Sequence, residues 1–300
     1  ALQDGGELGG SELPMGGDHG AGCLGVDLKL EPGASRTFCY MFCYGEDWRQ
    51  VDETISKYRR PEAAGHAVDA VRAFWRQRLE KLEVRTGDGT TDRFVNTWTP
   101  LNAAVALELC RRISTDHMGM DGLRYRDTTQ DALGVANFDP EFALHRMRQV
   151  FAQQRSDGAG CYAFFPYSPR PTTTPKVRSD NTVWQIYTMR NLIAETGDLD
   201  VMLEDIPFAD AGGATTYEHI RRGLHYIWER RGAHGLPTLF DVDWNDNLEL
   251  FGDRDAESVM LGMQLVYACR ELSGLAERLG REDDVAWCAE VAEDLADALN

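Results

Sequence analysis

Apolar residues recur at helical spacing over most of the chain beyond residue 92. The two clearest stripes are Leu261, Leu265, Cys269, Leu272, Leu275 and Leu279, followed by Gly280, and Val285, Cys288, Val291, Leu295 and Leu299. Similar patterns predict further helices over 94–113, 140–155, 183–196 and 217–230. The long segments between helices, which exceed the usual connector length and are candidate functional loops, are 114–138, 156–182 and 231–256. Paired helices with long loops fit an (α/α) toroid, a bundle or a solenoid.

The beginning of the chain has a different pattern. Apolar residues alternate with polar or small ones over 22–30, Pro32-Gly33 predicts a turn, and 37–44 is a second β-prone run. We therefore expect a hairpin at the end of a sheet. Two helices without a strand between them follow over 47–82 and indicate a connecting segment.

The composition is globular, with a strong negative charge. There are 31 Lys and Arg against 49 Asp and Glu, so the formal net charge is 31 − 49 = −18, which argues against nucleic acid or a membrane surface as partner. The seven cysteines show neither CxxC pairs nor a regular interval, which favours free thiols in a reducing cytosol. No run of about 18 apolar residues is present to span a bilayer. We therefore expect a cytoplasmic protein without a membrane partner.

The densest group of polar side chains lies in the segment from Asp241 to Asn247, which holds three carboxylates, one indole and two amides. Asp and Asn disfavour helix interiors, so this run predicts a loop that directs side chains into a cavity. An indole covers the apolar face of a pyranose, and a carboxylate accepts its hydroxyls or protonates its glycosidic oxygen. The alternative is an Asn/Asp-rich turn, with or without a cation held by oxygen ligands.

Four segments carry a resemblance to a known family. They are Tyr125-Arg126-Asp127-Thr128-Thr129-Gln130-Asp131-Ala132, Ile206-Pro207-Phe208-Ala209-Asp210 with Thr216-Tyr217-Glu218-His219, Asp243-Trp244-Asn245-Asp246, and Glu257-Ser258-Val259-Met260. In order and spacing they resemble the inverting glycoside phosphorylases of glycoside hydrolase family 94, nearest the chitobiose phosphorylase branch. The resemblance implies a mainly α fold, with the end of an antiparallel β-sandwich over 1–44, a helical linker over 45–85 and a partial (α/α)6 toroid over 86–300. It also implies a homodimer.

The resemblance implies a reversible phosphorolysis of a β-linked disaccharide or short oligosaccharide to an α-sugar 1-phosphate. Asp246 matches the general acid, Trp244 the wall that stacks on the sugar, and Asp127 the carboxylate that binds donor hydroxyls. Phosphate is itself an anionic nucleophile, so this reaction needs no general base. Asp246 must hold a proton near neutral pH, and we expect burial against Trp244 and repulsion from Asp243 to favour it. Phosphate is a cosubstrate, no cofactor or metal is implied, and the phosphate-binding residues are expected beyond residue 300.

The chain departs from the family pattern around the predicted site. The family's donor-site arginine has no clean counterpart, and Arg124 either replaces it or is a solvated surface arginine. Where many members have Cys-Ser-Asp-Asp, this chain has Arg178-Ser179-Asp180-Asn181, and Asn247 stands where Gly or Cys is commoner. The identities of the donor and acceptor sugars therefore stay open.

The remaining candidates for substrate binding are Asp243, Arg126 and Glu257. Arg126 is also a candidate for a salt bridge with Asp127 that shapes the loop, and Glu257 for bracing the acid loop or starting the next helix. Aromatic residues that could wall an acceptor subsite, or pack under the loop, are Tyr162, Phe164, Phe165 and Tyr167. Two other functions stay open, an inverting hydrolase with a second carboxylate to activate water and a noncatalytic sugar-binding relative.

Overall fold

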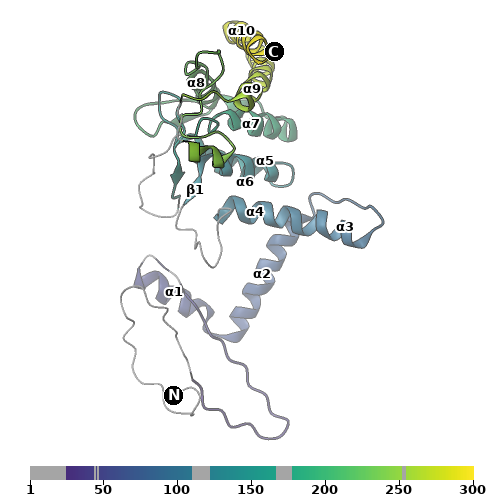
Figure 1. The fold of residues 1–300 in the computed structure, drawn as a ribbon. Helices are drawn as coiled ribbons and strands as arrows, with labels where there is room; N and C mark the ends of the chain where they lie inside the picture. Colours follow the sequence, from purple (N-terminus) through teal and green to yellow (C-terminus); the bar gives the residue numbers. More distant parts are fainter. Residues whose placement is uncertain (1–24, 44, 46, 110–121, 167–177, 252–254) are drawn as a thin grey trace. The chain divides into compact units, whose positions relative to one another are not determined.

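The computed structural model describes residues 25–43, 45, 47–109, 122–166, 178–251 and 255–300 (Figure 1). The chain divides into two compact units, residues 1–72 and 73–300. The predicted domain boundaries after residues 44 and 85 stay predictions.

The first unit holds helix α1 (Trp48–Tyr58) and the beginning of α2 (Pro61–Leu79). The Asp47 side chain caps α1 by accepting a hydrogen bond from the Gln50 amide at 2.8 Å. The structure assigns no strand to residues 25–43, so the predicted hairpin is absent there, although the Ala34 amide closes the predicted turn onto the Glu31 carbonyl. The physical reason is that a two-stranded hairpin is marginal without a covering layer, and the apolar side chains of this segment are largely exposed.

The second unit is built from paired helices in two layers. Helices α5 (Tyr125–Val135), α7 (Val183–Thr196) and α9 (Val259–Arg278) pack side by side in that order. Each is followed in the chain by a helix that packs against it, and these are α6 (Pro140–Phe151), α8 (Thr216–Trp228) and α10 (Glu282–Leu299). Before them come α3 (Gly89–Arg93), the π-helical turn η1 (Phe94–Trp98) and α4 (Thr99–Leu109), which packs on α5. This confirms the mainly α fold of a partial helical toroid.

Helix α5 corrects one prediction, because it lies within the segment 114–138 that was expected to be a loop. Its polar residues are compatible with a helix for local reasons. The Thr129 hydroxyl donates to the Tyr125 carbonyl one turn earlier at 2.8 Å, and Asp127 lies in the first turn, where a negative charge favours the helix. Tyr125, Ala132 and Val135 are fully buried, so tertiary packing stabilises the helix.

The core lies between the two helix layers and holds most of the predicted apolar stripes. Helix α7 ends at Gly197 in the left-handed conformation, as its glycine predicts. In the part of the chain that the structure describes, four short strands form two antiparallel pairs, β1 (Leu123–Arg124) with β2 (Ala163–Phe164) and β3 (Asp205–Pro207) with β4 (Gly213–Thr215). The described residues also include two 3-10 helices, η2 (Asp200–Leu203) and η3 (Asp246–Phe251).

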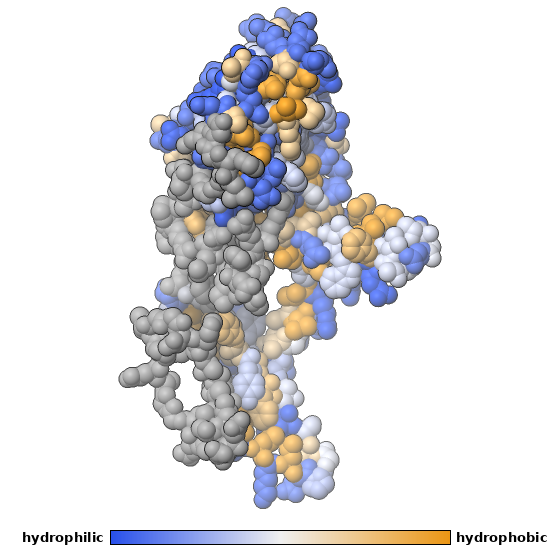
Figure 2. Space-filling view, viewed as in Figure 1, coloured by the Kyte–Doolittle hydropathy of each residue, from blue (hydrophilic) through white to orange (hydrophobic). Residues whose placement is uncertain are grey.

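Hydrophobic residues also reach the surface in patches among hydrophilic ones (Figure 2). Within the described residues, no helix is both long and apolar enough to cross a membrane, and no cluster of three or more His, Cys, Asp or Glu side chains could hold a metal ion. The five cysteines in the described part of the chain are free thiols.

Candidate active site

Three segments that are far apart in the sequence meet at one end of the inner helix layer. They are the start of α5, the residues 178–182 that precede α7, and the segment 241–247 that comes before α9. The Ser179 amide donates to the Val242 carbonyl at 3.0 Å, and the Arg126 side chain reaches both other segments. They converge because α5, α7 and α9 lie side by side with their N-terminal ends at the same edge.

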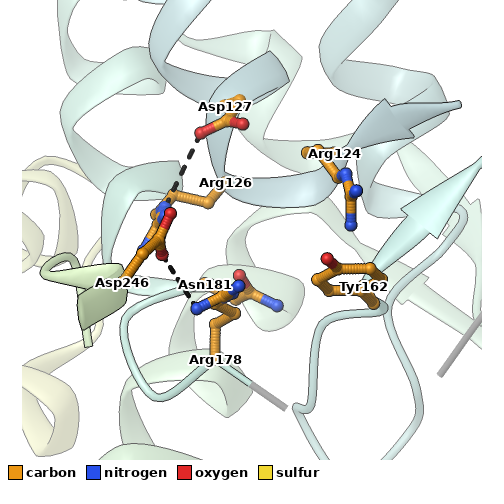
Figure 3. A pocket seen from close by; sticks show the side chains of 7 residues that line it. All are labelled: Arg124, Arg126, Asp127, Tyr162, Arg178, Asn181 and Asp246. Carbon is orange, nitrogen blue, oxygen red and sulfur yellow. Dashed lines mark hydrogen bonds and ion pairs between the residues drawn. The ribbon is translucent and has the colours of Figure 1, made fainter. Parts of the chain in front are cut away.

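An open hollow lies where these segments meet. The residues that line it are Arg124, Arg126, Asp127, Tyr162, Arg178, Asn181 and Asp246 (Figure 3). Three guanidinium groups therefore face two carboxylates. This composition suits the binding of hydroxyls and anions and leaves little apolar surface.

Arg126 is the centre of the site's ion-pair network. Its side chain is 10% exposed, and Nη1 lies 3.1 Å from Oδ1 of Asp180 and 2.9 Å from the Asp243 carbonyl oxygen. Nη2 donates to Oδ1 of Asp246 at 2.9 Å, and Nε lies 3.7 Å from Asp127. The predicted salt bridge with Asp127 is therefore the longest of its ion pairs. Arg126 therefore links the start of α5 to the other two site segments.

Asp180 does not line the hollow but supports it through Arg126, a role that the sequence did not indicate. Its carboxylate is fully buried and accepts hydrogen bonds from Arg126 and, at 3.0 Å, from the Trp184 indole N–H. Burial raises the pKa of the Asp180 carboxyl, while the charge and hydrogen bonds of Arg126 and the Trp184 indole oppose the rise. The sequence signal that could have indicated Asp180 is its place in the Arg178-Ser179-Asp180-Asn181 motif. Its pairing with Arg126 depends on the tertiary structure.

Asp246, the predicted acid, lies between two arginines. Oδ1 is 2.9 Å from Nη2 of Arg126 and 2.8 Å from Nη1 of Arg178, and the side chain is 49% exposed. The two residues that were expected to favour a proton on Asp246 are not among those that line the hollow. Trp244 is exposed and does not line the hollow, and the Asp243 carboxylate is engaged elsewhere. The immediate surroundings of Asp246 are instead positively charged.

Asp243 is buried and braces the loop that carries Asp246. Its Oδ1 accepts from the Asn245 amide at 2.8 Å, and its Oδ2 accepts from the Ser258 hydroxyl at 2.6 Å. The same Ser258 oxygen caps α9 by accepting from the Leu261 amide at 3.0 Å. Asp243 therefore ties the acid loop to the start of α9 and does not line the hollow.

Two arginines approach the ring of Tyr162, which lines the hollow. The guanidinium carbon of Arg124 lies 3.9 Å from the ring centroid, and that of Arg178 lies 5.6 Å from it. In Figure 3 Arg124 and Tyr162 stand on one side of the hollow and Asp246 on the other, with Arg178 and Asn181 between them. Arg124 therefore lines the hollow, and its Nε and Nη1 atoms are buried and not solvated. Arg178 was not predicted.

Glu257 and most of the other aromatic candidates lie outside the hollow. The Glu257 carboxylate accepts from the amides of His234 and Leu236 at 3.0 Å and 2.9 Å, and it also pairs with the His234 ring. It therefore braces the segment after α8, while Ser258 starts α9. Phe164 is buried in β2, and Tyr167 lies outside the described residues.

The comparison with known families agrees with this fold. The model described as "Glycosyl hydrolase 94 superfamily, catalytic domain" matches residues 74–300, so the chain belongs to this family. The match covers α3 to α10 and every residue that lines the hollow.

Several curated proteins are similar to the chain. An N,N'-diacetylchitobiose phosphorylase of Vibrio proteolyticus is 29% identical over 92% of this chain and 37% of its own length. A solabiose phosphorylase of Paenibacillus borealis is 26% identical over 93% of the chain and 35% of its length. The cyclic beta-(1,2)-glucan synthase NdvB of Rhizobium meliloti (strain 1021) is 28% identical over 100% of the chain and 11% of its length. The chain thus spans about a third of the phosphorylases it matches.

Proposed function

We propose that the protein catalyses the reversible, inverting phosphorolysis of a β-linked disaccharide or short oligosaccharide. The products are an α-sugar 1-phosphate and a shortened acceptor sugar. Asp246 acts as the general acid, Asp127 and Arg124 bind the donor sugar, and inorganic phosphate is the cosubstrate. The observation that carries this proposal is the placement of Asp246 in a polar hollow between two guanidinium groups, in a chain whose similar proteins include two phosphorylases.

The charges around Asp246 suit a reaction that runs in both directions. In cleavage a phosphate oxygen attacks the anomeric carbon, the glycosidic C–O bond breaks, and the leaving oxygen takes the proton of Asp246. The carboxylate that remains is stabilised by Arg126 and Arg178, as in the structure. In synthesis the same carboxylate accepts the proton of the attacking acceptor hydroxyl. Two cations beside the acid thus offset the negative charge of the carboxylate that cleavage leaves.

The experiment that tests the proposal is phosphate release in the synthetic direction. The natural protein is mixed with α-sugar 1-phosphate donors and acceptors that would give cellobiose, cellobionate and diacetylchitobiose. Asp246→Asn should abolish turnover and leave sugar binding intact, because the amide keeps the shape but carries no transferable proton. Asp294→Asn, at an exposed position of α10, is the matched control. Full activity of the Asp246→Asn variant would remove Asp246 from the acid role.

The two alternative functions have distinct outcomes in the same assay. An inverting hydrolase would release sugar in buffer without phosphate and would need a second carboxylate to activate water. Among the described residues the other carboxylate that lines the hollow is Asp127, and it lies beside Arg126. A noncatalytic relative would bind sugar without turnover under any condition.

The match to a cyclic glucan synthase favours a second candidate for the substrate. That match spans the whole of this chain, so the same catalytic domain could act on a longer β-glucan within a larger enzyme. Phosphate release that increases with acceptor chain length would support this candidate.

We further propose that the protein is cytoplasmic and works as a homodimer. Light scattering and cell fractionation test these two points.

A further inference from the structure

We infer that the hollow binds a carboxylate group on the acceptor sugar and that Arg178 selects for it. The inference rests on the proposed phosphorolysis and names its substrate class, a β-linked disaccharide whose leaving sugar is a sugar acid. It follows from the charge balance around Arg178, from the direction of the reaction and from the groups that surround the hollow.

Arg178 has a single counter-charge in the described part of the chain. Its side chain is 10% exposed, and Asp246 is the one described carboxylate within 4.0 Å of it. Nη1 lies 2.8 Å from Oδ1 of Asp246, yet it is not aligned for a hydrogen bond with that or any other described group. Arg126 differs, because it keeps Asp180 and Asp127 as further counter-charges.

Protonation of Asp246 removes the counter-charge of Arg178. In the cleavage direction Asp246 must carry a proton before it can act as the acid. A guanidinium that is nine-tenths buried then faces a neutral group, and a buried charge without a partner is costly. An anion beside Arg178 restores the balance.

The position of Arg178 assigns the anion to the acceptor sugar. Asp246 protonates the leaving oxygen, so a group in contact with Asp246 lies on the leaving-group side of the anomeric carbon. In an inverting displacement the nucleophile attacks from the opposite face. Phosphate therefore approaches away from Arg178, and the anion near Arg178 belongs to the leaving sugar.

The surroundings of the hollow are suited to a carboxylate. A guanidinium offers two parallel N–H groups to the two oxygens of a carboxylate. The ring of Tyr162, which both Arg124 and Arg178 approach, offers a wall for the sugar ring, and Asn181 adds an amide at the edge. The N-terminal ends of α5 and α7 lie at the same edge and add positive potential.

The test compares acid and neutral acceptors of the same sugar in the synthetic direction. With the natural protein and its donor, glucuronate and gluconate are each compared with glucose, and the ratio of kcat/KM for acid over neutral acceptor is measured. We expect a ratio of roughly 10 to 100, the range typical of a hydrogen-bonded charge pair. Both acceptors react through Asp246, so any effect of a substitution on the reactivity of Asp246 cancels in the ratio. A wild-type ratio of one or below would overturn the inference.

Three variants locate the selection at Arg178. Arg178→Met should bring the ratio close to one, and Arg178→Lys, which keeps the charge and loses the paired donors, should give an intermediate ratio. Arg155→Met, at an exposed position outside the hollow, should leave the ratio unchanged. An unchanged ratio in both Arg178 variants would overturn the inference. A KM for phosphate that rises equally with every sugar would also overturn it, because the anion would then be phosphate.

The outcome separates this inference from the proposed function. Phosphate-dependent turnover with a neutral acceptor preferred in wild type and Arg178→Met alike would retain the function and reject the carboxylate site. If no donor and acceptor pair turns over, titration calorimetry with glucuronate and glucose tests the site directly. Binding of glucuronate that exceeds that of glucose and is lost in Arg178→Met supports it, and equal binding rejects it.

Discussion

Replacing Arg126 by methionine is the perturbation whose effect the structure specifies best. Methionine keeps an unbranched stem but removes the guanidinium. The Asp180 carboxylate, which is fully buried, then loses its cation and keeps the Trp184 indole N–H. Removing one partner of a buried ion pair costs about 3–5 kcal/mol, because the other charge stays buried. Asp246 contributes less to this cost, since it is half exposed and keeps Arg178.

The cost of Arg126→Met should depend on pH with a definite sign. Burial already raises the pKa of Asp180, and Arg126 opposes that rise, so the variant raises the pKa further. The folded variant then binds more protons than the unfolded chain, and its stability falls as pH rises. One proton changes stability by at most about 1.4 kcal/mol per pH unit. Between pH 7 and pH 5 the variant should therefore regain up to about 2.7 kcal/mol relative to wild type.

The assay is urea denaturation followed by circular dichroism, with amide hydrogen exchange to report on α7 directly. The double variant Arg126→Met/Asp180→Asn should recover most of the loss, with a coupling energy of about 2 kcal/mol or more. Arg148→Met is the matched control, because it breaks an exposed pair with Glu204 and should cost about 1 kcal/mol or less. A loss within about 1 kcal/mol of the control, unchanged between pH 5 and pH 7, would refute the network described here.

Three further predictions concern stability and positioning. Gly158→Ala should destabilise the fold by about 2 kcal/mol or more in urea titrations, because Gly158 has φ +96° and a Cβ there would collide with the Arg222 carbonyl oxygen. Gly134→Ala, in α5 with its nearest contact at 3.9 Å, should be neutral or slightly stabilising. Ser258→Ala should cost about 2 kcal/mol of stability and lower kcat more than it raises KM, because it removes the cap of α9 and the hydroxyl that holds Asp243. Ser258→Thr should restore both the stability and kcat. An unaltered kcat in Ser258→Ala would disprove the positioning role. Burial and the nearby Arg221 lower the pKa of His225, so the unfolded chain takes up the proton first as pH falls below about 6.5, and the folded state loses stability. His225→Phe should reduce this loss of stability between pH 7.5 and 5.5. Equal dependence of the unfolding free energy on pH in wild type and variant would contradict the prediction.

Local signals in the sequence were sufficient to predict most of the helices. The stripes over 261–279 and 285–299 correspond to α9 and α10, and the Val183–Thr196 helix ends at Gly197 as expected. Helical periodicity, capping side chains and a left-handed glycine act within a few residues of each other, so a sequence alone can display them. The same local signals were misleading for α5, because its Asp and Thr residues are typical of a loop. Burial of its other side chains stabilises the helix, and a local pattern does not show this.

The composition of the site was partly predictable, and its contacts were not. Asp246 and Asp127 line the hollow as the resemblance to the family implied, and Arg124, whose place was left open, lines it too. Asp243 and Glu257 were expected to contact substrate and instead brace loops.

Which side chains meet was decided by the packing of α5, α7 and α9. That packing brings residues 126, 178 and 246 together from three segments separated by more than fifty positions. It also places Asp246 in the hollow, while Asp243 of the same loop is buried against Ser258. Sequence determined which residues were available for chemistry and which segments were helical. Tertiary structure alone determined that Arg178 faces the acid and that Asp180 is buried beside Arg126, because these contacts depend on distances across the helix layer that no local pattern encodes.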